Sequence, residues 1–281
     1  MAELLKGAPV AQSITENLIS RCEALKMNGL NPCLAMVKLG NDEADASYER
    51  NAEKRCEKVG IMVKHFNLPE KASKSEILGV INEINEDDSI HACLMFRPIY
   101  DKEIENEAAK LLLAKKDVDC MTAESLARVF LGRVEGFAPC TAQACIEILD
   151  FYGIDLTGKN VVVIGRSPVV GKPLSMMLQN RNATVTMCHT KTRELAEIAS
   201  KSDILMVAAG HAGVVNRNFV NDKQVIIDVG INVVDGQLTG DVDFNACEPI
   251  VAGISPVPGG VGAVTTSVLA KHIIEACENK V

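Results

Sequence analysis

The sequence has few of the patterns that mark zinc sites, disulfide scaffolds or membrane proteins. Its ten cysteines are scattered and form no C-x-x-C pair, so neither a metal site nor a small disulfide framework is indicated. No apolar run approaches the length of a membrane span, and no apolar signal core lies beside Glu3 and Lys6. We therefore expect a cytoplasmic protein with reduced thiols and no metal.

An excess of positive charge is also absent. The net charge of −8 argues against nucleic acid or an anionic membrane as the main partner. Hydrophobic residues make up 47% of the chain, which is ample for a core. A length of 281 residues suits two domains or one large one, and no repeat or low-complexity linker marks a boundary.

The most informative stretch is G-K-N-V-V-V-I-G-R-S-P-V-V-G-K-P, residues 158–173. Its β-branched run, 161–164, predicts a buried strand that breaks at Gly165, and Pro173 suits the first turn of a helix. A glycine turn between strand and helix predicts a phosphate site, because free N–H groups and the helix dipole point at the anion. The spacing differs from G-x-G-x-x-G, so an ordinary tight β-α turn stays an alternative.

Further strands alternate with a helical segment after this turn. We expect strands over 183–188, 204–209 and 225–229, with a helix around 195–199. Such alternation predicts a doubly wound parallel sheet, which binds ligands at the carboxyl ends of its strands. Four of these ends are short and polar or bear glycine, which favours a dinucleotide cleft: Gly165-Arg166-Ser167, His189-Thr190, Gly210-His211 and Gly230-Ile231.

The first half of the chain predicts a second β-α domain. Helices are expected over 10–25 and 43–59 and after a capping Ser73, and strands over 33–37, 61–66 and 90–96. A helix over 142–151 would lead into the second domain, and one over 265–278 would close the chain. We therefore predict a domain of residues 1–140 joined by the segment 265–281, and a dinucleotide-binding domain of residues 141–264.

Motifs along nearly the whole chain resemble those of bifunctional methylenetetrahydrofolate dehydrogenase/cyclohydrolase. They are Ser47-Tyr48, Val59-Gly60-Ile61, Lys116-Asp117-Val118-Asp119, Pro139-Cys140-Thr141, Val163-Ile164-Gly165-Arg166-Ser167, Cys188-His189-Thr190-Lys191-Thr192, Ile227-Asp228-Val229-Gly230-Ile231-Asn232, Gly240-Asp241-Val242-Asp243-Phe244 and Pro256 to Gly262. The resemblance implies a homodimer of chains with two α/β domains around a cleft, the C-terminal domain being Rossmann-like. It also implies oxidation of 5,10-methylenetetrahydrofolate to the 5,10-methenyl form in one-carbon metabolism and purine biosynthesis.

The resemblance also implies roles for particular residues. Tyr48 would stack on the aminobenzoyl part of the folate and Asp119 would hydrogen-bond the pterin, which makes these two the expected catalytic residues. The loop Pro258-Gly259-Gly260 would lie beside the substrate. The expected cofactor-binding residues are Gly165, Arg166 and Ser167 at the phosphates, Val170, His189, Thr190 near the adenosine ribose, and Ile231 and Thr265 at the nicotinamide.

The cyclohydrolase motifs depart from the family pattern. The family has Y-V-x-x-K, whereas Ala52 follows Tyr48-Glu49-Arg50-Asn51 here, and Phe96 stands where the family strand has glutamine. Cys120 replaces the usual glycine after Asp119. We therefore expect the cyclohydrolase activity to be lost or weak, with Lys54 or Tyr100 as alternatives for a relocated catalytic group.

The cofactor is expected to be NADP, with NAD possible. No acidic residue precedes Glu194 at the end of the second strand, where NAD sites usually hold the ribose hydroxyl with a carboxylate. Arg166, Lys191 or Arg193 could pair with a 2′-phosphate. Two other readings stay open: a cofactor-binding regulatory protein without turnover, and an amino-acid or shikimate-type dehydrogenase, for which no good Lys/Asp pair is found.

Overall fold

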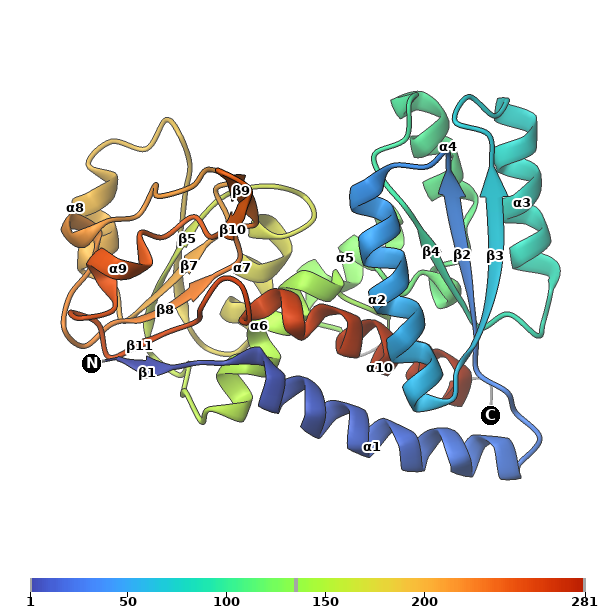
Figure 1. The fold of residues 1–281 in the computed structure, drawn as a ribbon, viewed down its shortest axis with the longest axis horizontal. Helices are drawn as coiled ribbons and strands as arrows, with labels where there is room; N and C mark the ends of the chain where they lie inside the picture. The colour runs from blue at the N-terminus through green and yellow to red at the C-terminus, as the bar shows by residue number, and fades with distance from the viewer. Residues whose placement is uncertain (1, 134–135, 280–281) are drawn as a thin grey trace. The chain divides into compact units, whose positions relative to one another are not determined.

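The computed structural model describes residues 2–133 and 136–279 and divides into two compact units. The first, here called the Rossmann unit, contains residues up to 12 together with 141–265. The second, the N-terminal unit, contains residues 13–140 and those from 266 onward. Each unit has its own parallel sheet with helices (Figure 1), which confirms the predicted α/β class.

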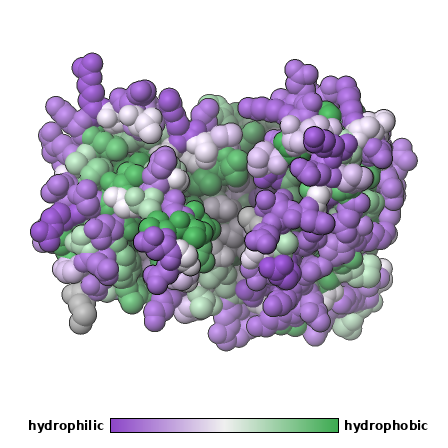
Figure 2. Space-filling model, turned by 45° about the horizontal axis from the view of Figure 1, so that its top comes forward, coloured by the Kyte–Doolittle hydropathy of each residue, from purple (hydrophilic) through white to green (hydrophobic). Residues whose placement is uncertain are grey.

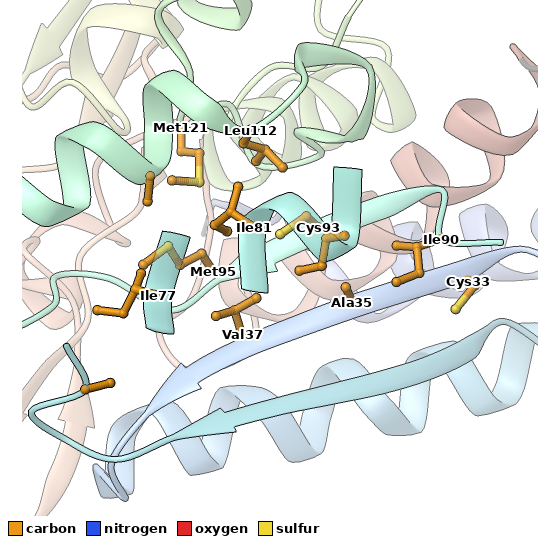
Figure 3. Close-up of a cluster of buried hydrophobic side chains, with 13 residues drawn as sticks. Cys33, Ala35, Val37, Ile77, Ile81, Ile90, Cys93, Met95, Leu112 and Met121 are labelled. Carbon is orange, nitrogen blue, oxygen red and sulfur yellow. The ribbon is translucent and has the colours of Figure 1, made fainter. Parts of the chain in front are cut away.

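The N-terminal unit is built on three parallel strands in the order β3-β2-β4. They are β2 (Cys33–Leu39), β3 (Met62–Leu68) and β4 (Ala92–Met95). Alternate residues of β2 and β4 pack against α3 (Lys74–Glu86) and α4 (Lys102–Leu111) in one buried cluster. Figure 3 shows Ile77 and Ile81 of α3 gathered with Val37 and Met95 of the sheet, which places the core of this unit between strands and helices.

Helix α2 (Glu43–Val59) connects β2 with β3 and has the bounds that its sequence pattern predicts. An ion pair between Lys38 of β2 and Glu49 of α2 joins the helix to the central strand. The capping role predicted for Ser73 is confirmed at α3, where Ser73 and Glu76 form a reciprocal capping box. This unit also contains α5 (Ala123–Leu131) and most of α1 (Gly7–Met27) and α10 (Thr265–Glu278), both of which begin in the Rossmann unit.

The Rossmann unit has a sheet of six parallel strands in the order β1-β11-β8-β7-β5-β6. The strands expected from the sequence are β5 (Asn160–Ile164), β6 (Thr184–Cys188), β7 (Ile204–Val207) and β8 (Val225–Asp228). The helices are α6 (Cys140–Phe151), α7 (Gly171–Asn180), α8 (Leu195–Ser200) and α9 (Phe244–Cys247). Strands β6 and β7 lie on opposite sides of β5, so the chain reverses its winding direction where the glycine turn leaves β5.

Two short features were not expected from the sequence. Strand β1 (Glu3–Leu4) pairs with β11 (Gly253–Ile254), so the first residues of the chain belong to the Rossmann sheet, whereas the predicted division keeps them with residues 13–140. Strands β9 (Asn232–Val234) and β10 (Gln237–Thr239) form an antiparallel hairpin. Elements of two or three residues are too short to show a hydrophobic period, which is why they escape a sequence pattern.

Hydrophilic residues cover much of the face shown in Figure 2, with hydrophobic areas between them. All ten cysteines are buried free thiols. Over residues 2–133 and 136–279, the structure contains no helix that is both long and apolar enough to span a membrane.

Candidate active site

The predicted folate-site residues of the N-terminal unit meet at the end of β4. Tyr48 lies on α2 and Phe96 follows β4, and their rings meet edge to face at 6.2 Å between centroids and 79° between planes. Ala52 lies one turn after Tyr48 and is completely buried. Burial raises the pKa of the Tyr48 hydroxyl well above its ordinary value, and the nearby Cys140 and Asp119 add to the effect, so the phenol stays neutral.

Asp119 is held by the backbone at the start of α6. The Cys140 N–H donates to Asp119 Oδ1 at 3.0 Å. Burial raises the pKa of the Asp119 carboxyl, while this hydrogen bond and the positive field of Arg97 oppose the rise. Cys120, which stands where the family has glycine, has a left-handed backbone with φ 56°.

His272 of α10 contacts the residues on either side of the Asp119–Cys140 hydrogen bond. Its Nδ1 lies 2.9 Å from the Val118 carbonyl oxygen and 3.7 Å from Cys140 Sγ, and its ring lies 5.0 Å from that of Phe137. Nothing in the sequence pattern distinguished His272 from an ordinary core residue of α10. Its contacts become apparent only when α10 is packed against residues 137–140.

The glycine turn after β5 leads into the N-terminus of α7, where the sequence predicts a phosphate site. Gly165 has φ 134°, and a Cβ there would lie 2.2 Å from the Ala208 carbonyl oxygen, so no larger residue fits. Ser167 Oγ accepts the N–H groups of Val170 at 3.0 Å and Gly171 at 3.4 Å. Because both contacts use the oxygen as acceptor, the Ser167 hydroxyl hydrogen is left to donate to an anion at the N-terminus of α7. Arg166 is exposed beside it.

The loop after β6 forms a closed turn that presents basic side chains. The His189 N–H donates to Thr192 Oγ1 at 2.9 Å, and the Lys191 N–H donates to His189 Nδ1 at 3.1 Å. Thr190, Lys191 and Arg193 are exposed around this turn. The turn therefore presents a hydroxyl and two cations at the surface, and Glu194 is the first acidic residue after it.

The remaining predicted residues of the Rossmann unit differ in accessibility. Ile231 exposes 67% of its surface, whereas Thr265 is buried and its hydroxyl donates to the Val261 carbonyl at 3.3 Å. In the loop Pro258-Gly259-Gly260, Gly259 accepts a hydrogen bond of 2.8 Å from the Gly7 N–H. Across the part of the chain that the structure describes, no group of three His, Cys, Asp or Glu side chains could hold a metal ion.

Family models match both parts of the chain. The model described as "Tetrahydrofolate dehydrogenase/cyclohydrolase, catalytic domain" matches residues 5–119, and that described as "Tetrahydrofolate dehydrogenase/cyclohydrolase, NAD(P)-binding domain" matches residues 139–281. The chain belongs to this family. Residues 141–265 of the Rossmann unit thus lie within an NAD(P)-binding region, which supports the predicted nicotinamide cofactor.

Individual family members are similar over their full lengths. The bifunctional protein FolD of Clostridioides difficile is 46% identical over 278 residues, which cover 98% of this chain and 96% of that protein. The structure of the bifunctional FolD of Campylobacter jejuni has a TM-score of 0.96 and 35% identity, with 100% of both chains covered. The FolD of Trypanosoma brucei, solved with NADP and an inhibitor, has a TM-score of 0.94 and 29% identity, covering 99% of this chain and 98% of that chain.

Proposed function

We propose that this family member is an NADP-dependent dehydrogenase that oxidises 5,10-methylenetetrahydrofolate to the 5,10-methenyl form. The observation that carries the proposal is the cluster of Tyr48, Asp119 and Cys140 in the N-terminal unit, combined with the glycine turn of an NAD(P)-binding region. A half-buried neutral phenol and a carboxylate held by a backbone N–H suit an aromatic, nitrogen-rich ring system. NADP, when bound, supplies the hydride acceptor, so the protein's part is to position the two reactants.

Each group of residues has a defined task in this proposal. Tyr48 would stack on the aminobenzoyl ring, and Asp119 would orient the pterin through its carboxylate. Ser167 and Arg166 would hold the cofactor phosphates. The experiment is to add methylenetetrahydrofolate and oxidised cofactor and to follow both products by absorbance. Reduced cofactor and methenyltetrahydrofolate should form together, whereas cofactor binding without turnover would favour the regulatory reading.

The preference for NADP over NAD is supported by the turn after β6. Lys191 and Arg193 are exposed there and no carboxylate precedes Glu194, so a 2′-phosphate meets positive charge and no repulsion. The relative from Trypanosoma brucei was solved with NADP. The ratio of kcat/KM for the two cofactors tests the assignment, and a higher value with NAD would overturn it.

We further propose that the cyclohydrolase step is lost or severely weakened. By the family resemblance this step uses a lysine and a glutamine, where this chain has Ala52, which is fully buried, and Phe96, which is 7% exposed. An alanine has no group to move a proton, and a phenylalanine cannot form a hydrogen bond in place of an amide. Purified protein should leave the decay of methenyltetrahydrofolate at the enzyme-free rate. Decay that accelerates in proportion to protein concentration would contradict the proposal.

One observation favours the alternative of a bifunctional enzyme with a relocated lysine. Lys38 forms an ion pair with Glu49, the residue next to Tyr48 on α2, and both side chains are 11% exposed. Of the groups considered from the sequence, Lys54 is exposed, and the Tyr100 hydroxyl is engaged with the Ala72 carbonyl at 2.7 Å. If the protein does hydrolyse the methenyl form, Lys38→Met should abolish that activity while the dehydrogenase activity persists.

A homodimer is proposed from the family resemblance. The chain has a mass of 30.2 kDa, so light scattering should give about twice this value.

A further inference from the structure

Two buried carboxylates lie on the cofactor edge of the Rossmann sheet, and the dehydrogenase chemistry uses neither of them. Asp228 ends β8 and is 3% exposed, and Asp241 follows β10 and is completely buried. Buried carboxylates are costly unless hydrogen-bond donors surround them. The hydrogen-bond donors around Asp228 and Asp241 therefore show which loops these carboxylates connect.

Asp241 joins the ends of two neighbouring strands. Its Oδ2 accepts the N–H groups of Ala209 at 2.6 Å and Gly210 at 2.8 Å, just after β7. Its Oδ1 accepts the side-chain amide of Asn232 at 2.9 Å, at the start of β9. One carboxylate thus sets the spacing between the loop after β7 and the loop after β8.

Asp228 holds Asp241 in place and extends the connection to a third loop. Its Oδ1 accepts the N–H groups of Gly230 at 2.9 Å and Asp241 at 3.1 Å, and its Oδ2 accepts that of Val242 at 3.0 Å. Its own N–H donates to Ser255 Oγ at 2.8 Å. Ser255 is followed directly by the loop that begins at Pro256.

Two glycines provide the space for this arrangement. A Cβ on Gly230 would lie 2.2 Å from Asp241 Cγ, and a Cβ on Gly240 would lie 1.9 Å from Asp228 Oδ2. Both distances are far below a normal contact, so the carboxylates and the glycines require one another. These close contacts fix the position of the loop 228–232.

We propose that Asp241, seated by Asp228, is a positioning residue for the nicotinamide end of the cofactor. The proposal rests on the proposed function and on the family resemblance, by which Ile231 would line the nicotinamide. Gly230 is bound to Asp228 and Asn232 is bound to Asp241, so the backbone on both sides of Ile231 is anchored while its side chain stays 67% exposed. Without the anchor at Asn232, the loop would keep its fold but lose the fixed place of Ile231.

The experiment exchanges the two partners. Asp241→Asn cannot satisfy all three donors, because its amide must face either Asn232 Nδ2 or the two backbone N–H groups. In the double variant Asp241→Asn with Asn232→Asp, the new amide donates to the new carboxylate and its oxygen still accepts from Ala209 and Gly210. Asp243→Asn is the matched control, since it makes the same change on the exposed cap of α9.

We expect Asp241→Asn to weaken NADP binding by about tenfold, the loss typical of one charge-assisted hydrogen bond. The KM for methylenetetrahydrofolate should stay within about twofold of wild type, and the double variant should regain most of the cofactor affinity. Asp243→Asn should bind NADP as wild type does. Cofactor affinity is measured by calorimetry without folate, so the result stands even if the protein proves to have no turnover.

Two results would overturn the inference. One is that Asp241→Asn lowers the melting temperature but leaves the NADP dissociation constant unchanged. The other is that the double variant regains the melting temperature without regaining NADP affinity. If Asp241→Asn does not fold, Asn232→Ala replaces it, because this change leaves the Asp241 bonds to Ala209 and Gly210 in place. An unchanged NADP affinity in a folded Asn232→Ala protein would equally refute the role.

Discussion

The cyclohydrolase proposal leads to a gain-of-function prediction at Ala52 and Phe96. Residues four apart on a helix lie side by side, so a lysine at position 52 extends from the same face of α2 as Tyr48. Phe96 meets the Tyr48 ring edge to face at 6.2 Å between centroids, so a residue at position 96 lies beside that face. The double change Ala52→Lys with Phe96→Gln should therefore supply both missing groups together.

The size of the gain follows from the chemistry that is restored. General acid–base help is worth roughly 10²–10⁴-fold in rate, which corresponds to about 3–5 kcal/mol of barrier. Ala52→Lys alone should recover little, because no amide would orient the ammonium group. The new lysine also enters a fully buried position, so we expect a lower melting temperature for both variants.

The assay is the loss of methenyltetrahydrofolate absorbance at several protein concentrations, after subtraction of the enzyme-free rate. Ala52→Met with Phe96→Gln is the matched control, since methionine approximates the apolar stem of lysine but has no proton to transfer. Dehydrogenase activity measured in the same samples shows that the site remains assembled. A double lysine–glutamine variant that retains dehydrogenase activity but hydrolyses no faster than the methionine control would refute the reasoning.

Three further predictions concern stability and cofactor choice. Ser73→Ala removes the capping box with Glu76 and should destabilise the protein by about 1 kcal/mol in chemical denaturation, whereas an unchanged unfolding midpoint would contradict that role. Replacing Lys191 and Arg193 by alanine should raise the KM for NADP several-fold and leave that for NAD unchanged, and an equal rise for both would show that these cations do not read the 2′-phosphate. Burial raises the pKa of Asp228 to about 6 against three backbone donors that lower it, so the folded state binds this proton more tightly than the unfolded state. The stability that the protonated Asp228 contributes is fully present below the unfolded-state pKa near 4 and is lost as the pH rises through about 6. Over this interval the free energy of unfolding of wild type should therefore fall by roughly 2–3 kcal/mol relative to that of Asp228→Asn. Stability curves that run parallel for the two proteins would show that the carboxyl pKa is not raised.

The sequence alone was enough for elements with a long hydrophobic period. The bounds of α2 and α10 agree with the pattern, and the strands from β5 to β8 lie where β-branched runs predict them. The glycine turn at Gly165 was also readable, because a backbone that bends sharply after a buried strand has a local signature. The departures at Ala52 and Phe96 were equally apparent, since they concern residue types and need no coordinates.

Tertiary structure decided the features that depend on contacts between distant residues. Strand β1 is a strand only because Glu3 and Leu4 pair with residues 253 and 254. Two residues are too few to show a hydrophobic period, so the sequence pattern did not predict this strand. Asp241 binds Ala209 and Gly210 across 32 and 31 positions of sequence, and nothing near Asp241 marks those partners. A hydrogen bond between loops is set by how the strands order themselves in the sheet, which is a property of the whole fold and not of any local pattern.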